Sequence, residues 1–500
     1  MKIRLLPALA LAALSLSPAS MVAQVVTVEL EEPGTLSSKI DPDMWYTMRT
    51  LTVKGPINGT DIKFLRDVAA LPMSGATEPK GKLTTLNLKA ARIVPGGDVY
   101  FASQSSSGRY YECVTRKDTV GHDMFYRFIN LKSLTIPDNT VYIDSTAICY
   151  TGITSFTIPP SVKGVGMGAF EINYELTRVT IPEGVESFGL LCFYHCDKLK
   201  SISFPNSVKE LGEGMFNYCD ALSYVKLPDN LEVIPMACFE NTHALETLNL
   251  PTTLRRIEER AFMYCSGLQS VNLPDGLEYI GPYAFSGCSE LRTCLIPAST
   301  QEIGYLSFAG TFELGGIQLA EENPNYCTID GSLFSKDSII MYQLYNGSMD
   351  TTYVMPPMVQ EIAYEGCGYN YYLKHLTLSP ALRIVSERGI DFCYQLQDLT
   401  CPAEEVPDCV GTAFDAAIQR QAVLYVPRAS LNAYKRAPQW KDFDTIRPIE
   451  GTPTAIPDIS LIKQGGGARY DTSGRRLDQP VHGINIIRNA DGTTRKVYVK

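Results

Sequence analysis

An apolar residue followed by proline returns at a fixed interval through the middle of this 500-residue chain. The first interval is 22 residues and the next six are 23 residues. The pairs are Ile136-Pro137, Ile158-Pro159, Ile181-Pro182, Phe204-Pro205, Leu227-Pro228, Leu250-Pro251, Leu273-Pro274 and Ile296-Pro297. Two further columns keep the 23-residue register, at Phe170, Phe193, Phe216, Phe239, Phe262, Phe285 and Phe308 and at Leu176, Leu199, Leu222, Leu245, Leu268, Leu291 and Leu314. Three columns in one register predict a solenoid of stacked coils.

Each unit of the repeat can be interpreted physically. In Leu245–Leu250 apolar and polar residues alternate, which is typical of a strand with one buried face. Pro251 ends that strand because it has no backbone N–H to donate. A second short extended piece follows at 254–257, and then a compact segment at 261–265 whose Phe262 should fill the core. We therefore predict a mainly β solenoid of about 23-residue coils, with parallel strands and short helical or turn segments.

The N-terminus has the pattern of a secretory signal peptide. Lys2 and Arg4 precede an apolar run from Leu5 to Leu16, and Ala23-Gln24 is a plausible cleavage point. The run is about a dozen residues long, whereas a membrane span needs roughly twenty. We expect an exported protein that does not stay inserted in a membrane after signal removal. The formal charge of −10 argues against nucleic acid as a partner.

The repeat and its flanks predict seven segments of the chain. Irregular spacing marks an N-terminal cap, Asp330-Gly331 predicts a hairpin turn, and Gly and Pro mark a linker. The segments are a signal peptide (1–23), an N-terminal cap with degenerate repeats (24–123), regular repeats (124–320), a hairpin insertion (321–353), C-terminal repeats and cap (354–450), a linker (451–467) and a short β tail (468–500).

The cysteines fit a packing role better than a chemical one. Ten of the fourteen fall on inward columns, where small apolar side chains fill a coil. Those in successive coils have their Cβ vectors side by side, which is poor geometry for a disulfide and favours free thiols. Cys113, Cys149, Cys327 and Cys409 are off these columns, and a pair among them stays open. The column cysteines are Cys192, Cys196, Cys219, Cys238, Cys265, Cys288, Cys294, Cys367, Cys393 and Cys401.

A search for reaction chemistry gives no candidate. Cys192, His195 and Cys196 are spaced like metal ligands, but both cysteines are core columns and His195 occupies a variable turn position. The five histidines are scattered, and no nucleophile elbow, zinc-protease or phosphate-loop motif occurs. We predict no catalytic, cofactor-binding or metal-ligating residues, and hence no enzyme.

The outward positions of the repeated strands form a regular, mostly small and polar face. One interpretation is a solvated surface, and the other is a broad binding face without a deep pocket. Tyr and Arg dominate binding energies, so the larger exceptions on this face are the candidates. The candidate protein-binding residues are Arg178, Tyr224, Lys226, Glu246, Asn249, Gln269, Asn272 and Arg292.

These repeats resemble a known family. The pattern L-x-x-L-x-[LI]-P, then V-x-x-I-G, then A-F-x-x-C is similar to the BspA-like leucine-rich repeat family, also known from Treponema surface antigens, over most of residues 124–450. The tail, with Arg469–Arg476, Gly483–Ile487 and Lys496–Lys500, resembles C-terminal modules of secreted Bacteroidetes proteins, some of which are sorting signals.

The resemblance implies an exported, non-enzymatic binding protein. Its location would be secreted or on the outer-membrane exterior, with the periplasm as the alternative. Its role would be that of an adhesin recognising host matrix or surface proteins, or proteins of neighbouring cells. A carbohydrate- or mucin-binding role and a structural envelope role remain alternatives. Trp45 and Trp440 lie in the predicted caps, away from the repeated face, which disfavours carbohydrate.

Overall fold

The structure, a computed structural model, describes residues 25–73, 76–104, 110–345, 347, 350–450 and four strands of the tail. The predicted signal peptide (1–23) and linker (451–467) lie outside these residues. The chain divides into two compact units between Arg447 and Pro448. In the second unit an antiparallel sheet has the order β36-β35-β37-β38. Its strands are β35 (Ala468–Tyr470), β36 (Arg476–Leu477), β37 (Gly483–Arg488) and β38 (Thr494–Val499).

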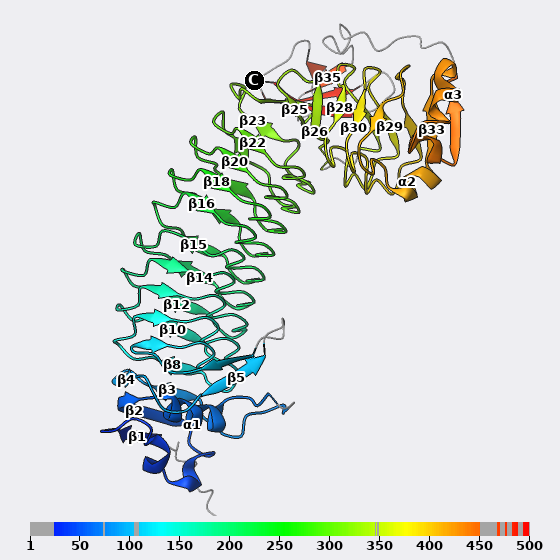
Figure 1. Ribbon diagram of the computed structural model, residues 1–500. Coiled ribbons are helices and arrows are strands. Elements are labelled where there is room, and N and C mark those ends of the chain that lie inside the picture. The colour runs from blue at the N-terminus through cyan, green and yellow to red at the C-terminus, as the bar shows by residue number, and fades with distance from the viewer. Residues whose placement is uncertain are drawn as a thin grey trace, which may run out of the picture. The chain divides into compact units, whose positions relative to one another are not determined.

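The first strand of each coil takes the same place in successive coils of the first unit (Figure 1). Neighbouring strands are parallel, and the pairs Ser201↔Tyr224 and Thr247↔Ser270 are one repeat apart. We call this series the first ladder. Its strands are β1 (Val25–Glu29), β2 (Thr50–Ile57), β3 (Thr85–Asn87), β8 (Ser133–Thr135), β10 (Ser155–Thr157), β12 (Arg178–Thr180), β14 (Ser201–Ser203), β15 (Tyr224–Lys226), β17 (Thr247–Leu248), β19 (Ser270–Val271), β21 (Leu295–Ile296) and β23 (Gln318–Leu319).

The second extended piece of each coil forms a second ladder, again parallel. Its strands have only two residues each because a turn precedes and follows them. They are β7 (Thr119–Val120), β9 (Tyr142–Ile143), β11 (Gly164–Val165), β13 (Ser187–Phe188), β16 (Val233–Ile234), β18 (Arg256–Ile257), β20 (Tyr279–Ile280) and β22 (Glu302–Ile303).

The compact segment closes the third side of each coil. Leu191 and His195 both have left-handed backbone, with φ of 54° and 55°, and such residues recur in the neighbouring coils. This conformation costs free energy for non-glycine residues, but the N–H of Leu191 and of Phe193 donate to carbonyls of the next coil at 2.8 and 3.0 Å. Hydrogen bonds between coils therefore hold the third side as well as the ladders.

The phenylalanine column forms the centre of the repeat. Every ring from Phe170 to Phe308 in this column is fully buried, and consecutive rings stack 5.2–5.7 Å apart. The leucine column is also buried. One coil could not bury these side chains alone, so their burial depends on stacking. The predicted mainly β solenoid is confirmed.

The N-terminal end of the first unit is irregular. Helix α1 (Gly59–Ala69) begins at Asn58, whose side chain accepts from the N–H of Thr60 while Asp61 accepts from the N–H of Asn58. The other elements here are η1 (Leu36–Lys39), η2 (Pro42–Met44), β4 (Ala91–Ile93), which pairs with β2, and the antiparallel hairpin of β5 (Phe101–Gln104) and β6 (Tyr110–Cys113).

An antiparallel hairpin, β24 (Tyr326–Ile329) and β25 (Ser332–Ser335), follows β23, and β25 also pairs with β26 (Ile340–Gln343). Parallel coils then resume and end in short helices, whose Tyr434, Trp440 and Phe443 are buried. These elements are β27 (Thr352–Val354), β28 (Glu361–Ile362), β29 (His375–Thr377), β30 (Ile384–Val385), β31 (Asp398–Thr400), β32 (Asp408–Cys409), α2 (Ala416–Gln421), β33 (Val423–Val426), η3 (Arg428–Ser430), α3 (Leu431–Tyr434), η4 (Trp440–Asp442) and β34 (Thr445–Pro448).

Among the described residues, no helix is both long and apolar enough to cross a bilayer.

Candidate functional site

The predicted candidates lie along the outward side of the first ladder, which we call the strand face. Arg178 on β12 pairs in register with Ser201, and Ser201 with Tyr224 on β15, so Arg178 and Tyr224 stand in one column two coils apart. Both side chains are exposed, Tyr224 by 55%. Lys226 is exposed at the end of β15. An aromatic ring and two cations are thus presented on one polar face.

The other five candidates continue this face over the next three coils. The N–H of Gln269 donates to the Glu246 carbonyl, and that of Arg292 donates to the Gln269 carbonyl, each at 2.9 Å. Arg292 Nη1 also lies 3.5 Å from Gln269 Oε1. Asn249 and Asn272 follow β17 and β19 and are exposed, whereas Gln269 is half-buried. The fold thus brings all eight predicted residues to the same side of successive coils.

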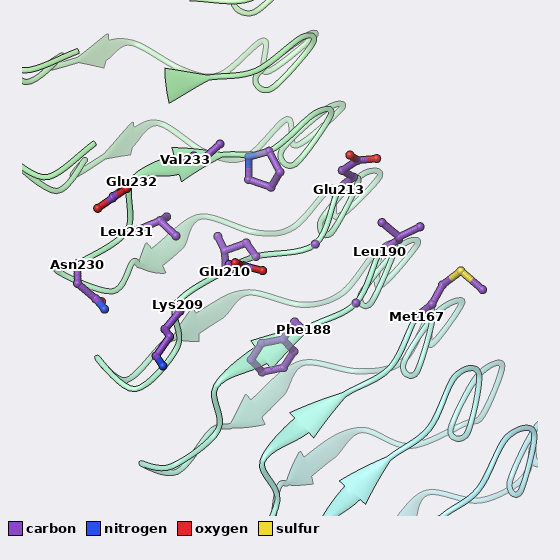
Figure 2. Close-up of a pocket in the computed structure, with 14 residues that line it drawn as sticks. Met167, Phe188, Leu190, Lys209, Glu210, Glu213, Asn230, Leu231, Glu232 and Val233 are labelled. Atoms are coloured by element: carbon purple, nitrogen blue, oxygen red, sulfur yellow. The ribbon is translucent and has the colours of Figure 1, made fainter. Parts of the chain in front are cut away.

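The hollow in Figure 2 lies on the second ladder, away from the strand face. It has a volume of about 780 Å³ and is lined by apolar side chains such as Leu190 and by Lys209, Glu210 and Glu232. Pro235 and Gly212 are among its lining residues. At the equivalent position of the next coils Glu258 and Gly281 donate their N–H to the preceding coil at 2.9 and 2.8 Å. Pro235 has no N–H and cannot make this bond, and Gly212 in the preceding coil does not make it either, so fewer hydrogen bonds join the coils at the hollow.

The third side carries a row of aromatic rings that the sequence analysis did not predict. Tyr174 lies 6.4 Å from Tyr150 and 6.1 Å from His195, and His195 stacks on Tyr218 at 4.6 Å. Tyr174 is 43% exposed and Tyr218 38%. We call these four residues the aromatic row. His195 was treated as a variable turn position, and the available signal was the repeated Tyr at equivalent positions such as Tyr150, Tyr218 and Tyr264.

The column cysteines fill the coil. All fourteen cysteines are free thiols. Cys196 and Cys219 donate their S–H to the carbonyls of Phe170 and Phe193 at 3.2 and 3.1 Å. Burial raises the pKa of the column thiols, to about 12 for Cys265. A protonated, enclosed thiol is a poor nucleophile.

The spacing Cys192, His195 and Cys196 does not form a metal site. Both cysteines are fully buried, whereas the His195 ring is in the aromatic row with Nδ1 at 3.2 Å from Asp197 Oδ1. A different set converges instead. Cys113, His122 and Asp123 place one ligand atom each within 4.8 Å of one another. The sequence does not predict this cluster, because Cys113 is off the repeat columns and the degenerate N-terminal repeats give no register that joins it to His122.

The two tryptophans pack inside the terminal regions. Trp45 is half-buried and meets the ring of Phe64 edge-on at 5.1 Å, while Trp440 is buried and donates to the Pro407 carbonyl at 2.7 Å. Neither ring lies on the strand face, so neither offers a sugar-stacking platform there.

Comparison with known proteins identifies the repeat. Residues 118–246 and 210–340 match a family model described as a BspA type leucine rich repeat region. No curated protein matches the chain. A leucine-rich repeat protein from Bacteroides ovatus is 23% identical, with 62% of this chain and 88% of that chain covered and a TM-score of 0.41.

Two further solved structures are similar to this chain. A leucine rich cell surface protein from Faecalibacterium prausnitzii is 20% identical, with 72% of this chain and 96% of that chain covered and a TM-score of 0.43. A leucine rich repeat protein from T. pallidum is 22% identical, with 38% and 87% covered and a TM-score of 0.30. Residues 118–340 are thus a leucine-rich repeat region of the BspA type.

Proposed function

We propose that this protein is an exported, non-enzymatic adhesin or interaction protein at the cell surface, which recognises proteins of the host or of neighbouring cells. The observation that carries the proposal is the strand face, where Arg178, Tyr224 and Arg292 are exposed on strands fixed by a continuous core. Leucine-rich repeat folds mediate protein interactions, and Tyr and Arg supply much of the energy of such contacts.

The size of the strand face suits a protein partner better than a small molecule. From Arg178 to Arg292 the face covers five coil steps, or about 24 Å at 4.8 Å per step. A standard protein–protein interface buries about 800 Å² on each partner. A patch of that area is about as wide as this stretch of the strand face. The side chains are held on strands whose inward neighbours, such as Val179 and Val225, are buried, so little ordering is needed on binding.

The proposal of export rests on two sequence features, the predicted signal peptide (1–23) and the short β tail (468–500). The predicted signal peptide directs the chain out of the cytoplasm, and the tail resembles sorting modules for surface display. If the tail sorts, the solenoid lies on the outer-membrane exterior. If it does not, the periplasm is the location.

Protease shaving of intact source cells tests this proposal. Released peptides from 124–450, with a periplasmic control protein left intact, would place the solenoid outside and justify a screen of host matrix proteins and mucins. Peptides released only after lysis would reject the surface location. Retention of a matrix protein by the purified full chain would support the partner class, and a screen without any binder would count against it.

Carbohydrate or mucin binding is the second candidate, favoured by the aromatic row. Exposed tyrosine rings such as Tyr174 and Tyr218 can pack on the apolar faces of sugars. A glycan array separates the two candidates: signal on glycans that is lost in Tyr174→Ala with Tyr218→Ala supports the second, and an array without signal rejects it.

A further inference from the structure

A cluster of three potential metal ligands lies among the N-terminal coils, apart from the strand face and the aromatic row. Cys113 is the last residue of β6, and His122 and Asp123 follow β7. Sγ of Cys113, a ring nitrogen of His122 and a carboxylate oxygen of Asp123 all lie within 4.8 Å of one another. Cys113 and Asp123 are 5% and 4% exposed, and His122 is half-buried. Three chemically different ligands therefore converge in a largely enclosed place.

The neighbouring hydroxyl groups fix the orientation of these ligands. Tyr111 donates to Asp123 Oδ2 at 2.9 Å, and Thr146 donates to Asp123 Oδ1 at 2.7 Å. Since the Thr146 hydroxyl has a single hydrogen, its 3.5 Å contact with His122 Nδ1 is favourable when Nδ1 carries the proton. The hydrogen-bond network thus assigns the Nδ1–H tautomer to a neutral His122.

In this tautomer an unprotonated ring nitrogen and a carboxylate oxygen lie close together. The unprotonated Nε2 of His122 lies 3.3 Å from Oδ2 of Asp123. Two electron-pair donors at this distance can bind the same cation. Donation from the other ring nitrogen to an outer-shell oxygen is also the usual arrangement of a metal-bound histidine. The three side chains therefore place a nitrogen, an oxygen and a sulfur atom close enough together to bind one cation.

We propose that Cys113, His122 and Asp123 bind one Zn²⁺ ion in a tetrahedral site with a fourth position open. Sulfur, imidazole nitrogen and carboxylate oxygen are the ligand types that zinc takes in proteins. Zinc–nitrogen and zinc–oxygen bonds of about 2.0–2.2 Å place two tetrahedral ligands roughly 3.3–3.6 Å apart. The 3.3 Å between Nε2 and Oδ2 matches this separation. From a separation of up to 4.8 Å, the sulfur would have to move by roughly 1.5 Å or less to complete the set.

A cavity adjoins two of the three ligands, Cys113 and His122. A hollow of about 340 Å³ is lined by Cys113 and His122 and also by Tyr111, Arg116 and Asp144. This volume admits water molecules, one of which would complete the tetrahedron. Asp144 lies 3.4 Å from Arg116 through Oδ2, so its charge is partly balanced and it adds negative potential beside the ion without having to ligate it.

Titration of the purified full chain with Co²⁺ tests the site, because cobalt replaces zinc and a thiolate–cobalt bond absorbs in the near ultraviolet. One Co²⁺ per chain with this charge-transfer band is expected, and Zn²⁺ should displace it. Cys113→Ser should abolish the band. The matched control is Cys149→Ser, a buried thiol of the neighbouring coil that is outside the set, and it should keep the band. A wild-type protein without the band, or a Cys113→Ser protein that retains it, would overturn the proposal.

A second variant guards against loss of folding in Cys113→Ser. His122→Gln changes a half-buried side chain and removes one ligand. A ligand that binds only the native state raises the unfolding temperature. Zn²⁺ should therefore stabilise the wild type strongly and the His122→Gln variant much less. The Kd of the variant for Zn²⁺ should be at least about tenfold higher. Equal Zn²⁺-induced shifts in the two proteins would overturn the site.

Discussion

The hydroxyl of Tyr283 donates a 2.7 Å hydrogen bond to Oε2 of Glu365, 82 residues further along the chain. Glu365 is fully buried, and its Oε1 lies 2.9 Å from Nη2 of Arg388. Beside them the ring of Tyr305 meets that of Tyr364 at 4.8 Å. The coils before the β24–β25 hairpin are thus tied to the coils after it by polar and aromatic side chains, in addition to the backbone.

Tyr283→Phe should weaken this tie. The change keeps the ring but leaves a buried carboxylate oxygen without its donor, which costs about 1–3 kcal/mol. Urea unfolding followed by circular dichroism should show a lower midpoint. Tyr224→Phe, on the exposed strand face, is the matched control and should leave the midpoint unchanged. Equal midpoints for all three proteins would show that the hydrogen bond does not contribute.

The same carboxyl group should make stability depend on pH. Burial raises the pKa of Glu365 and outweighs the attraction of Arg388. The folded chain therefore binds this proton more tightly than the unfolded chain, whose Glu pKa is about 4.3. Stability from this group is present below that value and is lost as the pH rises through the raised folded pKa.

Glu365→Gln removes the titration. Relative to this variant, the wild type should lose stability between about pH 5 and about pH 8. Urea midpoints of both proteins at the two pH values measure the difference. A wild type that gains stability relative to the variant over this range would contradict the raised pKa.

Phe239→Ala should destabilise the repeat strongly. The ring is fully buried and stacks between Phe216 at 5.4 Å and Phe262 at 5.3 Å, so truncation leaves a cavity between two coils. Buried Phe-to-Ala changes cost about 3–5 kcal/mol. Thermal unfolding should shift to lower temperature, whereas Thr247→Ala on the exposed strand face should change little. An unchanged transition in Phe239→Ala would mean that the column does not hold the core.

Periodic features of this fold were predictable because they repeat. Each phenylalanine of the column, Phe239 included, has the equivalent phenylalanines of the adjacent coils as neighbours. The column therefore predicts both the burial and the stacking of these rings. The register likewise predicts that Arg178 and Tyr224 stand on one face. Features outside the period were not predictable. Tyr283 and Glu365 meet across an insertion that breaks the register.

Two other features, the hollow on the second ladder and the cluster of Cys113 with His122, could not be predicted for related reasons. The hollow of Figure 2 lies where Gly212 and Pro235 do not make the hydrogen bond between coils that is formed at the equivalent position elsewhere, and the sequence pattern does not mark this difference. Cys113 reaches His122 through a hairpin in the degenerate N-terminal repeats, where no column relates the two. Side-chain convergence that does not follow the 23-residue period requires three-dimensional coordinates.

Because the column cysteines are packed inside the coils, their thiols should react slowly with alkylating reagents. Burial raises the pKa of Cys265 and Cys294 to about 12, and both side chains are fully enclosed. Cys327 is only half-buried. Brief alkylation of the native protein at about pH 8, with peptide mass spectrometry, should label Cys327 well before the column thiols. Denaturant should expose all fourteen. Labelling of Cys265 as fast as Cys327 would show that the coil opens readily.

Arg178→Ala combined with Tyr224→Ala tests the strand face directly. If this face binds the partner found in the matrix and mucin screen, the double variant should raise the Kd by about tenfold or more, since Tyr and Arg truncations at interfaces often cost over 1 kcal/mol each. Because both side chains are exposed, the unfolding midpoint should stay the same. Tyr174→Ala with Tyr218→Ala, on the aromatic row, is the matched control. Unchanged affinity in the first pair with weakened binding in the second would move the site to the aromatic row.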